Sequence, residues 1–285
     1  MIPYPNINPE IVSFGPYDIA GHSIGPIAIK WYGLMYVLGF IMSYFLIQKQ
    51  ERSRQMGLVG TVAQDLIFYL AVGLIVGGRL GYILFYEYNS FDGYFRHPLE
   101  IIATWHGGMS FHGGLIGCIL VGWIFCRRRK FPFFAVGDSV IVTVPVGLGL
   151  GRLGNFINGE LFGLPSDLPW AMIFPQGGPV PRHPTQLYES LAEGLLLFLI
   201  LWNLRKRHFR DGMMIVFFLA FYGVFRFVIE IFKEPDPQLG YLLGGHLTMG
   251  QVLCAGMILA AGALALYLRR LPQKPAAKAK AKRSK

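Results

Sequence analysis

Long apolar stretches separated by short polar segments run the length of the chain. An α-helix needs about 20 mostly apolar residues to cross the hydrocarbon core of a membrane. Seven stretches have this character, although the fifth is clear only if Tyr188 and Glu189 lie at its entry. We predict membrane-spanning helices at residues 28–48, 64–86, 106–126, 136–157, 189–204, 212–232 and 249–268.

The alternative is a large soluble protein whose helices are buried in its core. Helices of that kind would still carry a polar face toward solvent. Residues 191–201, with the sequence LAEGLLLFLIL, offer almost no such face. The pattern therefore predicts an all-α polytopic membrane protein with seven transmembrane helices.

Two connecting regions are long enough to form a small cap on one side of these helices. Residues 1–27 are rich in proline, glycine and asparagine, and residues 158–188 form the one long polar connection, with six prolines. We expect a single seven-helix membrane domain over residues 1–268, with an extracytoplasmic cap made by these two regions. Residues 269–285 then form a basic tail.

The composition agrees with a membrane protein. The chain has 285 residues, of which 53% are hydrophobic and 15% charged, whereas soluble globular chains carry about 25% charged residues. These values exclude intrinsic disorder, a collagen-like repeat and a disulfide scaffold. Cys118, Cys126 and Cys254 lie in or at the ends of apolar stretches without metal-ligand spacing, so we expect them to be small core residues.

The net charge of +10 comes from an uneven distribution of basic residues. Of the 26 lysines and arginines, 19 follow the first, third, fifth and seventh spans. Basic loops stay on the cytoplasmic side of a membrane, so the N-terminus is predicted outside and the C-terminus inside. No aromatic interleaving or nucleic-acid-binding fold accompanies the charge, which argues against a nucleic-acid partner. We expect the tail, AAKAKAKRSK, to be disordered and to contact anionic head groups.

Polar residues cluster at the outer end of the fourth span, where burial in a membrane is costly. Arg152 and Asn155 are three residues apart and share a helix face. With Asn158 and Glu160 they form a polar group near the outer surface. A guanidinium there can clamp a phosphate, because its planar fork matches two phosphate oxygens. The simpler alternative is an arginine that snorkels to the interface.

The sixth span carries a second polar stripe. Tyr222, Arg226 and Glu230 are spaced four residues apart and fall on one face of an otherwise apolar helix. Glu230 could neutralise Arg226 and hold it, and the remaining donors of Arg226 could then meet an anion. A purely structural ion pair within the helix is the alternative.

Two further residues could move a proton. His112 lies in the third span between glycines, and histidine titrates near neutral pH. It could equally serve as a hydrogen bonder between helices, and His106 is nearer the interface and more consistent with a structural role. Tyr32 follows Trp31 at the outer end of the first span, where an aromatic belt is the ordinary explanation.

These residues together predict a site for an anionic group at head-group depth. Phospholipid is the abundant candidate, and no Ser–His–Asp set, metal motif or Walker loop is present. A transporter or lipid scramblase would need a polar path to both membrane faces, whereas the polar residues here crowd the outer half. A non-catalytic receptor would leave the histidine and the two arginines unexplained.

Five motifs, in one order over nearly the whole chain, resemble those of the bacterial prolipoprotein diacylglyceryl transferases. The longest and most specific is GRLGNFINGELFG at residues 151–163. The outer loop at 164–181 and the basic tail have no counterpart in this resemblance. The other motifs are WYGLMY at 31–36, GGMSFHGGLIG at 107–117, RHPTQLYE at 182–189, and a YG–FR–E pattern at 222–230.

The resemblance implies a transferase that acts at the outer face of the bacterial cytoplasmic (inner) membrane. Such an enzyme moves the diacylglyceryl group of phosphatidylglycerol onto the lipobox cysteine thiol of a prolipoprotein. It forms a thioether and releases glycerol phosphate, which is the first step of lipoprotein maturation. The family needs no metal or organic cofactor.

The residues fit this implied chemistry. We expect Arg152 and Arg226 to stabilise charge on the leaving phosphate in a dry site. The incoming thiol reacts as a thiolate, so it needs a proton acceptor, for which His112 is the candidate and Tyr32 the rival. The expected phosphatidylglycerol-binding residues are Arg152, Asn155, Asn158, Glu160, Gly163, Tyr222, Arg226 and Glu230.

Overall fold

The computed structural model describes residues 2–5, 7–15, 17–19, 22–24, 27–87, 101–102, 107–234, 240–242 and 247–271. The chain divides into two compact units, and each is described by itself. The first unit comprises Met1–Ser43 and Val140–Lys285, and the second comprises Tyr44–Ser139.

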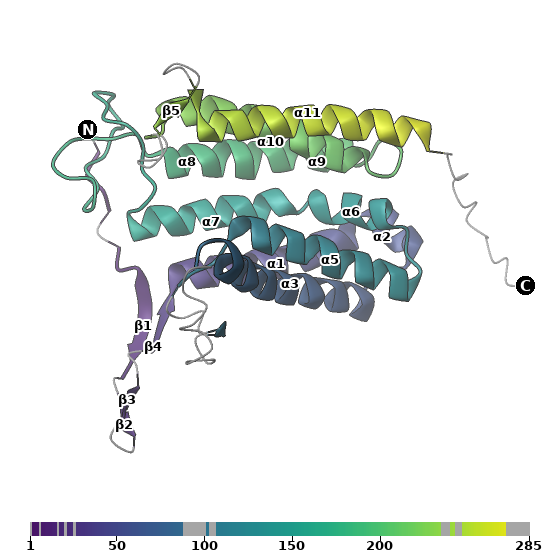
Figure 1. Ribbon diagram of the computed structural model, residues 1–285, viewed down its shortest axis with the longest axis horizontal. Coiled ribbons are helices and arrows are strands. Elements are labelled where there is room, and N and C mark those ends of the chain that lie inside the picture. Colours follow the sequence, from purple (N-terminus) through teal and green to yellow (C-terminus); the bar gives the residue numbers. More distant parts are fainter. Residues whose placement is uncertain are drawn as a thin grey trace, which may run out of the picture. The chain divides into compact units, whose positions relative to one another are not determined.

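Helices make up most of both units (Figure 1). In the second unit α1 (Trp31–Lys49), which begins in the first unit, is followed by α2 (Glu51–Met56), α3 (Thr61–Phe85), α5 (Phe111–Arg129) and α6 (Phe133–Ile141). The first unit contains α7 (Val144–Asn158), α8 (Thr185–Glu189), the π-helix η4 (Ser190–Leu196), α9 (Leu197–Leu204), α10 (Met213–Ile229), the 3-10 helix η5 (Glu230–Phe232) and α11 (Met249–Arg270).

Within the described residues, five helical segments are long and apolar enough to cross a membrane: Trp31–Lys49, Thr61–Phe85, Thr185–Leu204, Met213–Phe232 and Met249–Arg270. The pair α6 and α7, bent by 41° at its break, makes a sixth if it counts as one span. The predicted polytopic helical membrane protein is therefore confirmed, whereas the number seven stays a prediction. The third predicted span, α5, is not among these segments, because its glycines, His112 and terminal arginines lower its mean hydropathy.

Short strands accompany the helices, which the predicted all-α class did not include. In the N-terminal region β1 (Glu10–Phe14) pairs antiparallel with β4 (Ile27–Lys30), and β2 (Tyr17–Ile19) pairs with β3 (His22–Ile24). Ahead of α11, β5 (Tyr241–Leu242) pairs with β6 (Leu247–Thr248). Each pair has only two strands, so it depends on its surroundings for stability.

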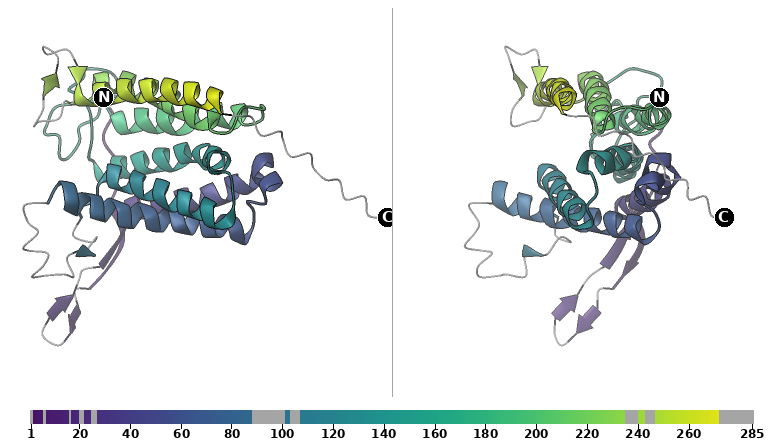
Figure 2. Two further views of the ribbon diagram at one scale, coloured as in Figure 1. Left: turned by 45° about the vertical axis from the view of Figure 1, so that its right-hand side comes forward. Right: turned by 90° about the vertical axis from the view of Figure 1, so that its right-hand side faces the viewer.

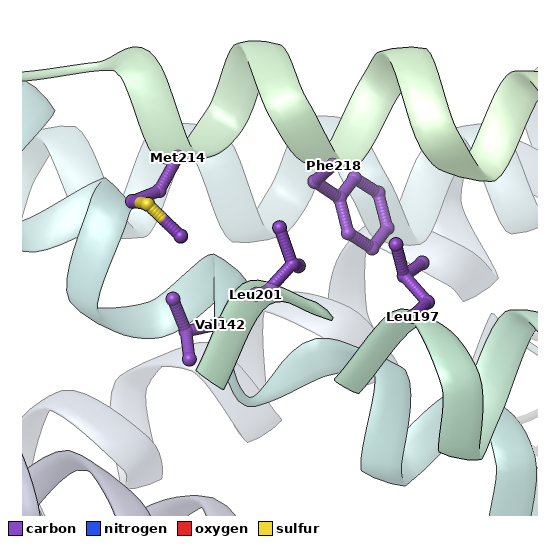
Figure 3. Close-up of a cluster of buried hydrophobic side chains, with 5 residues drawn as sticks. All are labelled: Val142, Leu197, Leu201, Met214 and Phe218. Carbon is purple, nitrogen blue, oxygen red and sulfur yellow. The ribbon is translucent and has the colours of Figure 1, made fainter. Parts of the chain in front are cut away.

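In the first unit, α7, α9 and α10 enclose a hydrophobic cluster. Figure 3 shows its five buried members, Val142, Leu197, Leu201, Met214 and Phe218. The backbones of α7 and η4 also approach closely, because glycines meet there. A Cβ added to Gly149 would lie 3.0 Å from the Cα of Gly194. Glycines therefore bring η4 and its side chains against α7.

In the second unit, α3 and α5 lie side by side (Figure 2). The four-residue spacing of Gly73, Gly77 and Gly81 in α3 predicts a close-packing face, and these glycines meet glycines of α5. A Cβ on Gly77 would lie 2.8 Å from the Cα of Gly117, and one on Gly81 would lie 2.6 Å from the Cα of Gly113. The predicted close packing is confirmed, and it has no room for a methyl group.

The start of α5 differs from the prediction of a span at 106–126. Gly107 and Gly108 have φ values of 89° and 75°, which a helix does not allow. The helix begins after Ser110, whose hydroxyl accepts from the Gly113 backbone N–H at 3.2 Å. Arg79 of α3 donates to the backbone oxygens of Gly107 and Gly108 at 2.8 and 3.0 Å.

The fifth span begins four residues earlier than the predicted residue 189. Pro184 is the N-cap of α8, so Thr185 is the first helical residue and not the cap. The hydroxyl of Thr185 donates instead to the backbone oxygen of Leu161 at 3.1 Å. The cysteines behave as expected for core residues, since Cys126 and Cys254 are buried and Cys118 is half-buried.

Candidate functional site

The end of α7 places three polar side chains near a helix terminus. Arg152, Asn155 and Asn158 recur every third residue and so share one side of the helix. Gly159 then ends the helix in the left-handed conformation, with φ of 68°. The guanidinium of Arg152 stays partly accessible, with 23% of the side chain exposed.

The polar stripe predicted on the sixth span lies along α10 and continues into η5. Arg226 Nη2 lies 3.1 Å from Glu230 Oε2, as expected for an i, i+4 pair. Tyr222 is half-buried one turn earlier, where its ring stacks on Phe218 at 5.5 Å between centroids. The otherwise apolar α10 therefore carries a single polar stripe, which faces the interior of the unit.

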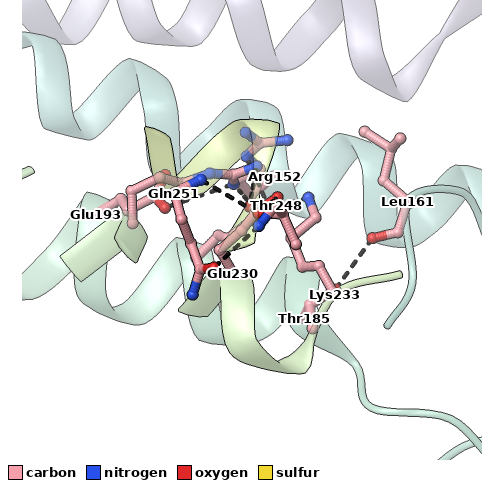
Figure 4. A network of polar contacts seen from close by, with 10 residues as sticks. Arg152, Leu161, Thr185, Glu193, Glu230, Lys233, Thr248 and Gln251 are labelled. Carbon is pink, nitrogen blue, oxygen red and sulfur yellow. Dashed lines mark hydrogen bonds and ion pairs between the residues drawn. The ribbon is translucent and has the colours of Figure 1, made fainter. Parts of the chain in front are cut away.

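Glu189, which the sequence analysis placed only at the entry of a span, is the centre of the site. Figure 4 shows this network of polar contacts, with Arg152, Glu230 and Lys233 among its labelled residues. Its carboxylate is completely buried. Oε2 lies 3.0 Å from Arg152 Nε, while Oε1 pairs with Arg226 Nη1 and accepts from Lys233 Nζ at 2.9 Å. One carboxylate therefore links three cations from separate parts of the chain.

A second carboxylate, Glu193, lies one turn further along in η4. Only 1% of its side chain is exposed. Its one ion pair within the described residues is a long contact of 3.6 Å between Oε1 and Arg226 Nη1, and neither of its carboxylate oxygens accepts a hydrogen bond there. Glu193 is therefore the least satisfied charged group of the cluster.

The third carboxylate, Glu230, is held from α11. The hydroxyl of Thr248 lies 3.4 Å from Glu230 Oε1, and Thr248 also forms a capping box with Gln251. Gly250 faces the Glu230 carboxylate so closely that a Cβ there would overlap it. The start of α11 is thus shaped around the partner of Arg226.

The cluster contains three cations and three carboxylates joined by ion pairs within 4 Å, and their side chains are buried or mostly buried. Burial of one ion costs several kcal/mol unless the ion is paired. The equal number of cations and carboxylates therefore offsets the desolvation cost of the cluster. Lys233, just past the sixth span, is an example. Burial lowers the pKa of its ammonium, and the Glu189 carboxylate opposes that shift.

Asn155, Asn158 and Glu160 form a separate hydrogen-bonded group beside the arginines. The side-chain amides of both asparagines donate to Glu160 Oε1, each at 2.9 Å. Gln186 fixes the same loop by donating to the backbone oxygen of Glu160 at 2.6 Å. Glu160 thus orients the two amides, whereas the Arg152 ion pair is made by Glu189 and not by Glu160.

Gly163 lies where the outer loop meets the end of the sixth span. It forms a β-bridge with Lys233, and a Cβ on Gly163 would overlap the backbone oxygen of Phe232. Glycine is required here by close backbone approach, because an added Cβ has no room. Leu161, two residues earlier, has φ of 60°, an uncommon value for a bulky residue. This strained loop holds the backbone before Lys233 in place.

Tyr32 belongs to the first unit and packs against the helix that carries Arg152. A Cβ on Gly154 would lie 2.9 Å from Cδ2 of Tyr32, so only glycine admits the ring at this point. The hydroxyl of Tyr32 lies 3.1 Å from that of Tyr36. The tyrosine is therefore near the arginine site, with its hydroxyl in a hydrogen bond.

His112 belongs to the second unit, so its position is described only within that unit. It lies in the first turn of α5, exposed, with its ring edge-on to Phe111 at 5.7 Å between centroids. It is thus at the start of a helix and not inside one, as the predicted span implied. His106 lies outside the described residues.

A shallow apolar hollow of about 320 Å³ follows η4 and α9. It contains none of the charged residues of the cluster, so we assign it no part in the ionic site. Its position suits contact with lipid chains. The lining residues are Leu191, Ala192, Leu195, Leu196 and Leu199.

The sequence analysis missed Glu189, Glu193 and Lys233 as parts of the site. The signal for Glu193 was available, because an acidic residue inside an apolar span is costly and points to function. Glu189 and Lys233 lie at span ends, where charged residues are ordinary. Only the packing of α8 and η4 against α7 and α10 reveals their common role.

Chemically, the site can bind one small anion. Arg152 uses Nε for Glu189, and its two Nη groups make no ion pair within the described residues. Arg226 is more fully engaged, since Nη1 and Nη2 contact three carboxylates. Within the described residues, Arg152 therefore has more donors outside ion pairs than Arg226 has.

Comparison with known proteins gives one consistent result. The profile of the prolipoprotein diacylglyceryl transferase family matches residues 20–267. A protein of Desulfotalea psychrophila is 50% identical over 270 residues, which cover 93% of this chain and 97% of the relative. A protein of Geobacter sulfurreducens is 51% identical over 259 residues, which cover 91% and 98%. One of Methylococcus capsulatus is 48% identical over 274 residues, which cover 95% and 99%. All three are named phosphatidylglycerol–prolipoprotein diacylglyceryl transferase.

Proposed function

The chain belongs to the prolipoprotein diacylglyceryl transferase family, and we propose that its buried ionic cluster binds the phosphate of the lipid donor. As a member of this family it transfers the diacylglyceryl group of phosphatidylglycerol to the cysteine thiol of a prolipoprotein. A thioether forms and glycerol phosphate leaves, in the first step of lipoprotein maturation. The observation that carries the site assignment is the convergence of Arg152 and Arg226 on one carboxylate.

That convergence supports phosphate binding for a geometric reason. Glu189 holds both guanidinium groups next to each other, so a second small anion can contact both without bringing them together. The free Nη groups of Arg152 offer the two parallel donors that a phosphate prefers. Displacement at the glyceryl carbon leaves a phosphate monoester, and fixed donors stabilise the charge that develops there.

The thiol proton has two candidate acceptors, and the proposal keeps both. His112 has an imidazole at the exposed start of α5. Tyr32 packs on Gly154, two residues after Arg152 in α7, and suits either a relay or a contact with the head group. Asn155 and Asn158, oriented by Glu160, would bind the glycerol hydroxyls. Tyr222 and Glu230 would position Arg226.

The topology of the chain is part of the proposal. We infer seven spans across the bacterial cytoplasmic membrane. The N-terminus then lies on the outer side and the basic tail on the cytoplasmic side. The charge bias of the loops supports this orientation, which places the cluster toward the outer face. Residues 1–27 and 158–188 would then form an extracytoplasmic cap over a single membrane domain at 1–268.

The activity can be tested with purified full-length protein. It would be incubated with labelled phosphatidylglycerol and a peptide that carries a lipobox cysteine. We expect labelled thioether peptide and an equal amount of glycerol phosphate. Lipid that changes leaflet without either product would instead indicate a scramblase.

Substitutions then test the assigned roles. Arg152→Lys should lower transfer at least about tenfold, because an ammonium cannot reproduce the fork of the guanidinium. Activity near wild type in this variant would contradict the phosphate assignment. His112→Gln and Tyr32→Phe, measured separately, decide between the two proton acceptors, since full activity in either variant removes that residue as the acceptor.

A further inference from the structure

Glu193 is buried with nothing to neutralise it fully. It lies in η4 with 1% of its side chain exposed, and neither carboxylate oxygen accepts a hydrogen bond from any described residue. Its contact with Arg226, at 3.6 Å, is the longest ion pair of the cluster. Arg226 is already paired with Glu189 and Glu230. A carboxylate in this setting gains little from being ionised.

The backbone beside Glu193 has little room to move. The next residue, Gly194, lies against the backbone of α7, where a Cβ would come within 2.6 Å of the Cα of Gly149. The same segment is a π-helix, an arrangement often found at functional sites. Since the backbone at Gly194 is packed against α7, Glu193 can change its charge more readily than its backbone position.

The charge of the cluster changes when substrate binds. The charges of the three cations and three carboxylates of the chain balance one another. The phosphodiester of phosphatidylglycerol adds one negative charge, and the phosphate monoester that leaves carries more. Excess charge is costly at low dielectric, so uptake of a proton by one carboxylate would restore the balance.

Among the three carboxylates, Glu193 loses the least ion-pair stabilisation when it is protonated. Glu189 contacts three cations, and Glu230 contacts Arg226 at 3.1 Å and Thr248. The titratable and charged groups that face Glu193 from α7, α8, α10, η5 and its neighbours are Arg152, Glu189, Tyr222, Arg226, Lys233 and, at the edge, Cys254.

We propose that Glu193 takes up one proton when the lipid phosphodiester binds beside Arg152 and Arg226, which makes it a positioning residue for the transfer reaction. The proposal rests on the proposed function of the cluster. The proton comes from water and forms an O–H bond on the carboxylate, and no other bond changes. It returns to water when glycerol phosphate leaves. Neutral Glu193 releases its hold on Arg226, whose guanidinium can then turn toward the phosphate.

Calorimetry on the full-length protein in detergent tests this proposal. Dihexanoyl-phosphatidylglycerol would be titrated at one pH in two buffers with different heats of ionisation, and the difference gives the number of protons taken up. We expect about one proton per lipid in wild type and none in Glu193→Gln. Wild-type affinity should fall up to about tenfold per pH unit in alkaline buffer, while the variant should show no such slope.

A matched control comes from an exposed carboxylate. Glu234 pairs with Arg182 at 3.2 Å and is 53% exposed, so Glu234→Gln makes the same charge change outside the cluster. Its proton uptake should equal that of wild type. Uptake that persists in Glu193→Gln, or that is absent in wild type, overturns the proposal.

A second measurement keeps the test independent of whether the variant folds. An infrared difference spectrum of wild-type protein with and without the lipid should show a new protonated-carboxyl band, and its absence also overturns the proposal. The transfer assay separates the two hypotheses. Protein that neither binds phosphatidylglycerol nor transfers would contradict the proposed function, whereas binding and transfer without proton uptake contradict only the role of Glu193.

Discussion

At the scale of single residues, a substitution of Gly250 can perturb the ionic cluster without replacing any of its charged residues. A methyl group at this position would overlap the carboxylate of Glu230. We expect Gly250→Ala to displace Glu230 from Arg226 and from Thr248. Loss of a charged hydrogen bond costs about 1.5–3 kcal/mol, so transfer in the phosphatidylglycerol assay should fall about tenfold or more.

The same helix provides the control for Gly250→Ala. Gly256 and Gly262 have no atom within 4 Å of an added Cβ, and alanine favours a helix over glycine. Gly256→Ala and Gly262→Ala should therefore retain transfer. Full activity in Gly250→Ala would show that the close fit around Glu230 is not needed.

His183, on the outer loop, connects stability to pH. Burial lowers the pKa of its imidazole, and Nδ1 lies 3.2 Å from the Tyr188 hydroxyl. The unfolded chain binds the proton more readily, so stability is complete above the ordinary histidine pKa, near 6.5, and is lost as pH falls through the lower folded value. The midpoint of thermal unfolding should drop over this acidic range by less in His183→Asn than in wild type.

An exposed histidine serves as the comparison for that measurement. His208 follows α9 and is exposed, so His208→Asn should keep the acid sensitivity of wild type. Equal sensitivity in His183→Asn and wild type would mean that groups other than His183 set the stability in acid.

The residue pattern predicted part of the site. The polar stripe on α10 follows from helical spacing alone, because Tyr222, Arg226 and Glu230 are neighbours along one helix. Glu189 and Lys233 are 44 residues apart, and their contact at 2.9 Å depends on how helices pack. No local spacing contains that information, so the centre of the site could not be read from the chain.

At the scale of elements, the pairing of α3 with α5 depends on glycine. A Cβ on Gly117 would overlap the backbone oxygen of Gly73, and backbone atoms cannot yield as a side chain can. We expect Gly117→Ala to cost about 1–3 kcal/mol through overpacking. Thermal unfolding in detergent would show a lower midpoint for this variant.

Gly122, in the same helix, is the matched control. An added Cβ there would meet only Cδ2 of Leu70 at 3.8 Å, which is ordinary contact. Gly122→Ala should leave the unfolding midpoint close to that of wild type. Equal midpoints for the Gly117 and Gly122 variants would contradict a backbone contact between α3 and α5.

Apolar length predicted the helices well and their ends less well. The third span was expected to begin at residue 106, but Gly107 and Gly108 adopt positive φ and α5 starts after Ser110. The π-helix within the fifth span left no sign in the pattern either, since it arises where Gly194 packs on Gly149. Hydropathy measures whether a segment prefers lipid and contains little about backbone hydrogen bonding.

At the scale of the whole molecule, the orientation in the membrane follows from charge and can be measured. Asp167, in the outer loop, and Arg207, after the fifth span, are both exposed. In intact cells a membrane-impermeant maleimide should label Asp167→Cys, and should label Arg207→Cys only after the membrane is opened. The native cysteines are buried or half-buried, so the unsubstituted protein sets the background. The reverse pattern would contradict the inferred topology.

The ionic cluster also has a consequence for how the protein is made. Arg226 and Glu230 neutralise each other within one helix, so α10 can enter the bilayer alone. The segment from α8 to α9 carries Glu189 and Glu193 and no counter-charge of its own. Arg152 is synthesised before that segment, but Arg226 and Lys233 come after it. The fifth span therefore gains two of its three counter-charges only after the sixth has been synthesised, so we expect these two spans to insert together.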